Sequence, residues 1–198
     1  MNFKKIITGL ALSMLLSTGM AVAADFSKGL QAAQSGDFKT ALAVWTPLAE
    51  QGNAMAQFNL GHMYANGYGV PENDKTAVKW FTKAAEQGLA EGQFNLGAMY
   101  DFGDGVPEND KTAVKWYTLA AEQGYATAQR YLGAMYDFGD GVPQNDKTAV
   151  KWYTLASYNG SEVARENKDA VAKQMTPADI SAAQDMSSRC LENNYRDC

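Results

Sequence analysis

The chain is poor in the side chains that most often perform chemistry. Its 198 residues include one histidine, His62, and two cysteines, Cys190 and Cys198. A zinc site built on several histidines is therefore excluded, and a Ser-His-Asp triad would have to use His62. No serine after residue 23 has a lysine three positions later, so the S-x-x-K motif of penicillin-binding enzymes is absent. No glycine-rich loop leads into Lys-Ser or Lys-Thr, which excludes a P-loop.

The chain also lacks an excess of positive charge. It has 17 Lys and Arg residues and 22 Asp and Glu residues, and the lysines recur along the sequence instead of forming one cluster. Nucleic-acid binding is therefore not expected, and neither is a cofactor or a metal ion. The segments beginning at Asp101 and Asp137 leave a Ca²⁺ site as the weaker alternative. We interpret the recurring acids mainly as helix N-caps (Asp74, Asp110 and Asp146) and as solvated loop residues.

What the chain does have is an internal repeat of 36 residues. Residues 76–111 and 112–147 are identical at 28 of these 36 positions. Residues 40–75 follow the same pattern more loosely, and a further copy begins at Thr148 and then decays. A period of this length is typical of stacked repeat architectures, in which each unit buries its apolar face against its neighbours.

Each unit contains two helical patterns separated by turn residues. Apolar residues recur at helical spacing over residues 113–121 and again over residues 126–136. Gly139 stops the second pattern, and the link over residues 139–143 has the composition of a turn. Every unit is therefore predicted to be a helical hairpin.

A glycine inside the second helix recurs at Gly61, Gly97 and Gly133. A glycine within a helix costs about 1 kcal/mol relative to alanine, so its repetition indicates that no side chain fits there. We expect two helix backbones to approach each other at these glycines. The neighbouring large core residues are expected to be Trp80, Trp116 and Trp152.

These residues resemble the Sel1-like repeat, a relative of the tetratricopeptide repeat. The motif A-x-A-x-x-x-L-G-x-x-Y-x-x-G-x-G-V, an acid, and A-x-x-W-[FY]-x-x-A-A-x-x-G occurs here as Ala54, Ala56, Leu60, Gly61, Tyr64, Gly67, Gly69, Val70, Asp74, Ala77, Trp80, Phe81, Ala84, Ala85 and Gly88. The next unit has Gly92 in place of the second alanine, and the third has Ser157 and Tyr158 where alanine and glutamate are expected.

The resemblance covers roughly residues 36–160. It implies an all-α, right-handed α-α solenoid of Sel1-like hairpins with C-terminal capping helices, an interaction role, and no shared catalytic residues. The positions expected to be structural are Leu60, Gly61, Tyr64, Trp80, Leu96, Gly97, Tyr100, Trp116, Leu132, Gly133, Tyr136 and Trp152.

The start of the chain predicts export, and export in turn predicts the state of the two cysteines near the other end. Lys4 and Lys5, an apolar run over residues 6–16 and the small residues at 21 and 23 form the pattern of a signal peptide over residues 1–23, with an uncleaved anchor as the alternative. Residues 24–52 are expected to form a capping hairpin, residues 53–160 the repeats (53–88, 89–124 and 125–160), and residues 161–198 the C-terminal caps. In an oxidising compartment, Cys190 and Cys198 are expected to form a disulfide, with a metal or redox pair as the weaker alternative.

Comparison of the units suggests where a partner binds. Positions that change between units lie where the fold does not require one residue, and large aromatic or arginine side chains at such positions often anchor interfaces. In such a solenoid the second helix of each unit is expected to line the concave surface. The partner-binding candidates are Phe58, His62, Phe94, Arg130 and Tyr131 on this helix, and Phe102 and Phe138 at the edge of the loops. His62 as an exposed helix residue, and the phenylalanines as packing between repeats, are the alternatives.

The sequence therefore predicts a periplasmic, monomeric and non-enzymatic adaptor. It would bind a protein or peptide on its concave repeat surface and would have no membrane segment after signal cleavage. A secreted factor acting on host or neighbouring cells is one alternative. A hydrolase such as a β-lactamase-like enzyme is the other, and the chain offers no convergent titratable groups in support of it.

Overall fold

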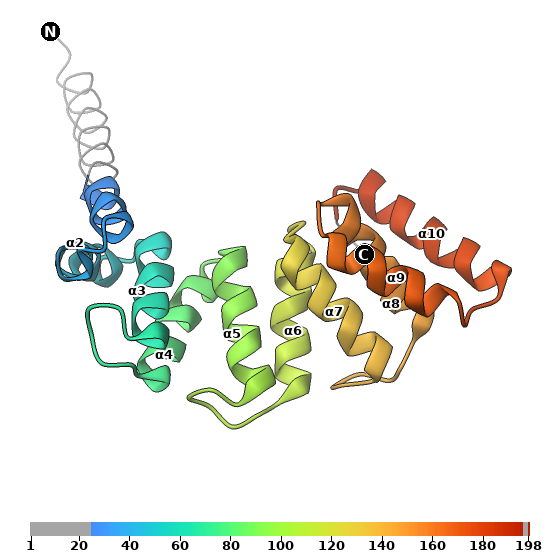
Figure 1. Ribbon diagram of the computed structural model, residues 1–198, viewed down its shortest axis with the longest axis horizontal. Coiled ribbons are helices and arrows are strands. Elements are labelled where there is room, and N and C mark those ends of the chain that lie inside the picture. Colours follow the sequence, from blue (N-terminus) through green and yellow to red (C-terminus); the bar gives the residue numbers. More distant parts are fainter. Residues whose placement is uncertain (1–24, 196–197) are drawn as a thin grey trace, which may run out of the picture.

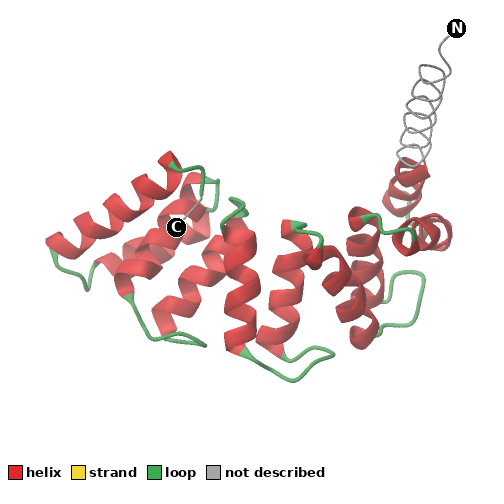
Figure 2. Ribbon diagram, turned by 180° about the vertical axis from the view of Figure 1, so that it is seen from behind, coloured by secondary structure: helices red, strands yellow, loops and turns green. Residues whose placement is uncertain are grey.

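The computed structural model describes residues 25–195 and residue 198, and every regular element in these residues is helical. The helices stack one after another into an elongated, curved array with α2 near one end and α10 at the other (Figure 1). Figure 2 shows the same stack from behind, with short loops joining successive helices. The predicted signal peptide lies outside the described residues. Within them, no helix combines the length and the apolar character needed to cross a membrane.

The helices follow each other as antiparallel pairs. A helix over residues 25–34 precedes α2 (Phe38–Glu50). Three repeat pairs follow, namely α3 (Ala54–Asn66) with α4 (Asp74–Glu86), α5 (Ala90–Phe102) with α6 (Asp110–Ala121), and α7 (Ala126–Phe138) with α8 (Asp146–Tyr158). The array ends with α9 (Glu162–Ala172) and α10 (Pro177–Glu192).

The repeat helices form two layers. Trp116 of α6 packs against the cluster that contains Phe81 of α4, and Trp152 of α8 belongs to the cluster built on α6 and α7. On the other side, the rings of Phe94 in α5 and Tyr131 in α7 lie 5.3 Å apart. We call α4, α6 and α8 the outer layer and α3, α5 and α7 the inner layer. The core is accordingly a series of clusters along the stack, as expected for contacts that run between neighbours.

The N-caps of the outer-layer helices are asparagines, not the predicted aspartates. The side-chain oxygen of Asn109 accepts a hydrogen bond from the backbone N–H of Thr112 at 3.0 Å, and Asn73 and Asn145 do the same in their units. Asp74, Asp110 and Asp146 come one residue later and occupy the first helical position. There they face the positive end of the helix dipole, so the acids favour the same helix starts without capping them.

The recurring glycines make room for an aromatic ring, as close packing requires, but the ring is not that of the predicted tryptophan. A Cβ atom added to Gly133 would lie 2.7 Å from the ring of Tyr153, and one added to Gly97 would lie 2.7 Å from the ring of Tyr117. At Gly61 the obstructing ring is Phe81. The tryptophan that precedes each of these residues packs instead with the apolar cluster of the preceding hairpin, which joins one unit to the next.

The C-terminal segment folds back onto the last repeat. Thr176 caps α10, and a disulfide joins Cys190 to Cys198. The backbone oxygen of Cys198 accepts a hydrogen bond of 2.7 Å from Nζ of Lys151. The Tyr195 hydroxyl donates to Asn159 Oδ1 at 2.9 Å. The tail is thus held to α10 by the disulfide, and to α8 and its C-cap by two hydrogen bonds.

Replacing Cys198 with serine removes the disulfide and should lower the free energy of unfolding by about 2 kcal/mol. The loss is modest because the loop that the disulfide closes is short. Urea denaturation monitored by circular dichroism would measure this change. The protection of the Tyr195 amide against hydrogen exchange should fall with it. Reducing agent should destabilise the unmodified chain equally and leave the variant unchanged. A variant as stable as the unmodified chain would contradict the prediction.

Candidate interaction surface

An aromatic cluster on the inner-layer helices α5 and α7, with one ring from α6, contains three of the predicted partner-binding residues. The Phe94 ring lies 5.6 Å from both Tyr117 and Tyr125 and 5.3 Å from Tyr131, and the Arg130 guanidinium lies 4.3 Å above the Tyr131 ring. We call these five residues the aromatic cluster. Phe94, Tyr125, Arg130 and Tyr131 are half-buried. They are therefore held by packing and still reach solvent, which is the state of an anchor residue before its partner arrives.

Phe58 and His62 form a second, smaller group one unit earlier. The His62 ring lies 5.5 Å from Phe58 and 6.4 Å from Phe81. The side-chain amide of Asn66 donates to the His62 backbone oxygen at 2.8 Å. His62 is exposed as a residue, but its ring lies against these aromatic rings, and this desolvation lowers its pKa. A contact role for a neutral imidazole is therefore more consistent with its surroundings than a charged one.

Phe102 and Phe138 lie apart from both groups. Each is the last residue of an inner-layer helix, and they are 60% and 72% exposed. Neither ring takes part in the aromatic contacts described above. They form the separate loop-edge position that the sequence suggested. Among residues 25–195 and 198, no three His, Cys, Asp or Glu side chains lie close enough together to hold a metal ion.

Two Tyr–Asp pairs join an inner-layer helix to an outer-layer helix, and in each pair the tyrosine is buried and the aspartate is half-buried. The Tyr117 hydroxyl donates to Asp101 Oδ2 at 2.9 Å, and the Tyr153 hydroxyl donates to Asp137 Oδ2 at 3.3 Å. Burial raises the pKa of Asp101 although the hydrogen bond from Tyr117 opposes the shift. Burial and the adjacent carboxylate raise the pKa of Tyr117 as well. In the first unit the matching positions are Phe81 and Ala65, which pack in one apolar cluster.

The apolar version of this pair suggests a double-mutant test. Replacing Tyr117 with phenylalanine alone should cost about 1 kcal/mol of unfolding free energy, because Asp101 loses its donor. Adding Asp101→Ala should cost less than it does in the unmodified chain, with a coupling energy of about 1 kcal/mol. Urea denaturation of the four proteins in this cycle measures it. Strictly additive effects would show that the hydrogen bond contributes no net stability.

A set of buried glutamines was not found from the sequence. The side-chain amide of Gln93 on α5 donates to the backbone oxygen of Ala85 at 3.2 Å, and its oxygen accepts from Gln123 at 2.7 Å. The equivalent bonds recur one unit earlier and one unit later, where the buried glutamines are Gln57 and Gln129. We call these bonds the amide ladder. Each of the three buried glutamines links its own helix to the helix before it and to the C-terminal end of the helix after it. The last donor, Asn159, also accepts a hydrogen bond from Tyr195.

The geometry of the units agrees with the comparison to known families. The Sel1 repeat family matches residues 54–89, 90–125 and 126–161, which is more than half of the chain. The chain belongs to the Sel1 repeat family. This assignment accounts for the recurring Leu-Gly pair of the inner layer and the Trp-[FY] pair of the outer layer. Comparison with curated proteins gives no match.

Solved structures of other Sel1 repeat proteins are similar to this chain. A Sel1 repeat protein from Oxalobacter formigenes is 38% identical with a TM-score of 0.68, and the match covers 72% of this chain and 59% of that protein. A protective antigen of uropathogenic Escherichia coli with an SLR fold is 29% identical with a TM-score of 0.62, over 88% of this chain and 46% of the antigen. Helicobacter pylori cysteine-rich protein B is 25% identical with a TM-score of 0.54, over 66% of this chain and 93% of that protein. The chain thus spans only part of the first two relatives.

Proposed function

We propose that this Sel1 repeat protein is a non-enzymatic adaptor of the periplasm that binds a partner protein or peptide on its inner layer. The observation that carries the proposal is the aromatic cluster. Phe94, Arg130 and Tyr131 lie at positions that change between units, yet they pack against one another while remaining half-exposed. Because these side chains are already ordered, binding a partner loses little conformational entropy.

Export is supported from the two ends of the chain. The first 23 residues have the sequence pattern of a signal peptide, and the disulfide between Cys190 and Cys198 is of the kind that persists in oxidising compartments. The two observations together support a periplasmic location. Separating periplasm from culture medium would distinguish this location from that of a secreted factor.

Photo-crosslinking in cells would test the binding surface. A photoreactive amino acid at Met55 or Glu91 would lie on the inner layer at positions that change between units, and Met55 is 41% exposed. We expect one discrete protein of the cell envelope to be captured from these sites. The same amino acid at Lys173, beyond the repeats, is the matched control and should capture nothing specific.

A second variant identifies the residues responsible. Arg130→Glu reverses the charge above Tyr131 without removing a ring from the cluster, so it should abolish capture while circular dichroism stays unchanged. Capture that is insensitive to Arg130→Glu would remove the aromatic cluster from the binding surface. Capture from Phe102 or Phe138 alone would place the partner at the loop edge.

A further inference from the structure

Helices α6 and α8 contain the same eleven residues in a row. Asp110–Ala120 and Asp146–Ala156 both read DKTAVKWYTLA. The sequence is identical, but the surroundings on the side of the helix that faces away from the inner layer are not. On α8 this side is covered by α10 and by Cys198, whose backbone oxygen accepts a hydrogen bond from Nζ of Lys151, so that Lys151 is 4% exposed and Leu155 is 0% exposed. On α6 the equivalent Lys115 is exposed and Leu119 is 44% exposed.

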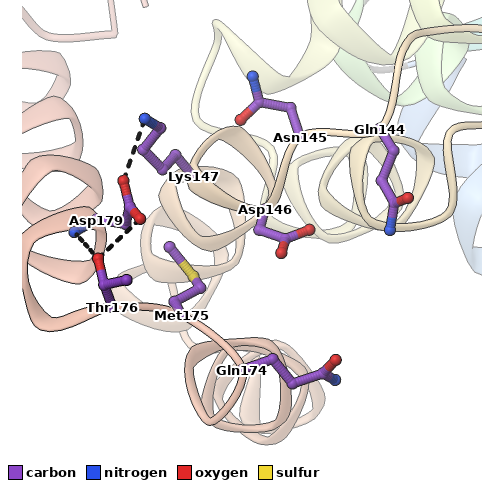
Figure 3. Close-up of a pocket in the computed structure, with 8 residues that line it drawn as sticks. All are labelled: Gln144, Asn145, Asp146, Lys147, Gln174, Met175, Thr176 and Asp179. Atoms are coloured by element: carbon purple, nitrogen blue, oxygen red, sulfur yellow. Dashed lines mark hydrogen bonds and ion pairs between the residues drawn. The ribbon is translucent and has the colours of Figure 1, made fainter.

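The contacts between α8 and α10 show how this helix face binds another helix. Near the start of both helices, Nζ of Lys147 lies 3.2 Å from Oδ1 of Asp179, which the Thr176 cap also holds (Figure 3). Further along, the Ser187 hydroxyl donates to the backbone oxygen of Lys151 at 3.4 Å. The contacts rise together in both sequences, so α10 runs parallel to α8.

Small side chains let α10 approach closely. Ala183, Ser187 and Cys190 are all buried, and they recur at the spacing of one helix face. Cys190 belongs to the same apolar cluster as Leu155. The occupant of this face is therefore a helix with an acid near its N-terminus, followed by small residues after four, eight and eleven positions.

The open copy of this face on α6 lies in positively charged surroundings. Lys111 and Lys115 are exposed on α6, and Lys75, Lys79 and Lys83 are exposed on the neighbouring α4. None of these five lysines forms an ion pair with another residue in the described part of the chain. The nearest acids in the α6 sequence, Asp110 and Glu122, lie at the two ends of the helix.

We propose that the outer face of α6, formed by Lys111, Lys115 and Leu119, is a docking site for an acidic helix of a partner protein, which binds it as α10 binds α8. The face has the same sequence as one that binds a helix within this chain. Its exposed leucine has the apolar character that the docked helix covers on α8, and its unpaired lysines complement an acidic partner. The site belongs to the outer layer and is separate from the proposed inner-layer surface.

The α10 of a second copy is a less suitable occupant. In each copy, α10 is already bound to α8 by the Lys147–Asp179 ion pair, and its tail is tied back by the disulfide. Moving it to another copy would expose Leu155 while it covers Leu119, with no net gain in buried surface. A free peptide with the α10 sequence is nevertheless a suitable probe, because it carries the residues that contact the equivalent face of α8.

The test is binding of a fluorescent, oxidised peptide of residues 176–198 to the whole protein, followed by fluorescence anisotropy. We expect saturable binding that is weakened by on the order of tenfold in the variant Lys111→Glu/Lys115→Glu. The matched control, Lys39→Glu/Lys173→Glu, makes the same change in net charge at exposed lysines elsewhere and should bind like the unmodified protein. A second test variant, Leu119→Ser, should weaken binding without changing the charge.

The peptide offers its own matched pair. Asp179→Asn in the peptide should weaken binding, whereas Asp185→Asn, which makes the same change of charge at an exposed position of α10, should have little effect. Binding that is unchanged by the α6 variants would place the peptide elsewhere, for example on α8 after displacing α10, and would overturn the proposal.

Two further outcomes would also overturn it. One is the absence of saturable binding up to about 1 mM peptide. The other is the absence of peptide binding together with cosedimentation of the protein with phosphatidylglycerol vesicles that depends on Lys111 and Lys115. That result would assign the face to an anionic membrane surface instead of a helix.

Discussion

Replacing Gln129 with alanine is expected to lower the free energy of unfolding by about 4 kcal/mol. The side chain is 0% exposed. Its amide nitrogen donates to the backbone oxygen of Ala121 at 3.0 Å, and its oxygen accepts from Asn159 at 2.9 Å. Truncation removes both bonds, leaves a buried carbonyl and a buried amide without partners, and opens a cavity where α6, α7 and the end of α8 meet.

Urea denaturation would measure this loss, and Gln31→Ala is a suitable control. Gln31 is an exposed helical glutamine in the first hairpin, so its truncation should change stability by less than about 0.5 kcal/mol. A loss of under about 1 kcal/mol for Gln129→Ala would mean that water replaces the amide at low cost. The amide ladder would then be a minor contribution to the stack.

Replacing Gly133 with alanine is expected to lower the free energy of unfolding by about 3 kcal/mol, against the helix propensity of alanine. The new methyl group would lie 2.7 Å from two carbons of the Tyr153 ring. That ring is 1% exposed and donates its hydroxyl to Asp137, so it has no free space into which to move. Either the ring or the whole of α7 must shift.

The sign of this effect makes the test decisive. Propensity alone would stabilise the variant by about 1 kcal/mol, so a stabilised Gly133→Ala would contradict the packing argument. The neighbouring Ala134→Gly provides the comparison, because it should cost about 1 kcal/mol, mainly through propensity. Thermal unfolding of both variants should therefore show losses of stability of clearly different size.

The period of the sequence predicted stacked helical hairpins, because a hairpin that recurs every 36 residues has few ways to bury its apolar face, and the resemblance to the Sel1-like repeat implied the solenoid. Details that depend on a choice between adjacent residues were not predictable. Asn109 and Asp110 are both good N-caps, and the backbone conformation at the helix start decides between them. Trp152 and Tyr153 are both large aromatic residues, and the pattern of apolar residues does not say which one faces Gly133.

The candidate surface shows a different limit. Comparison of the units predicted Phe94, Arg130 and Tyr131, because it selects changing positions on the inner layer. All three residues belong to the aromatic cluster. The amide ladder was not predicted, because glutamine is neither a titratable group nor a common metal ligand. Its signal was present in the sequence, since glutamine recurs at Gln57, Gln93 and Gln129. The exposure of the outer face of α6 could not be predicted from the sequence, because the same residues are covered on α8 and exposed on α6.

The amide ladder also bears on how such a protein can change its length. The segment over residues 90–125 contains an acceptor for the next unit in Ala121, a buried amide in Gln93 and the donor that completes it in Gln123. A tandem duplication of this segment would therefore bring a complete set of bonding partners and leave none of them unmatched. In the last unit the donor is Asn159, whose side-chain oxygen also accepts a hydrogen bond from Tyr195. The number of units can therefore vary during evolution without breaking the amide ladder.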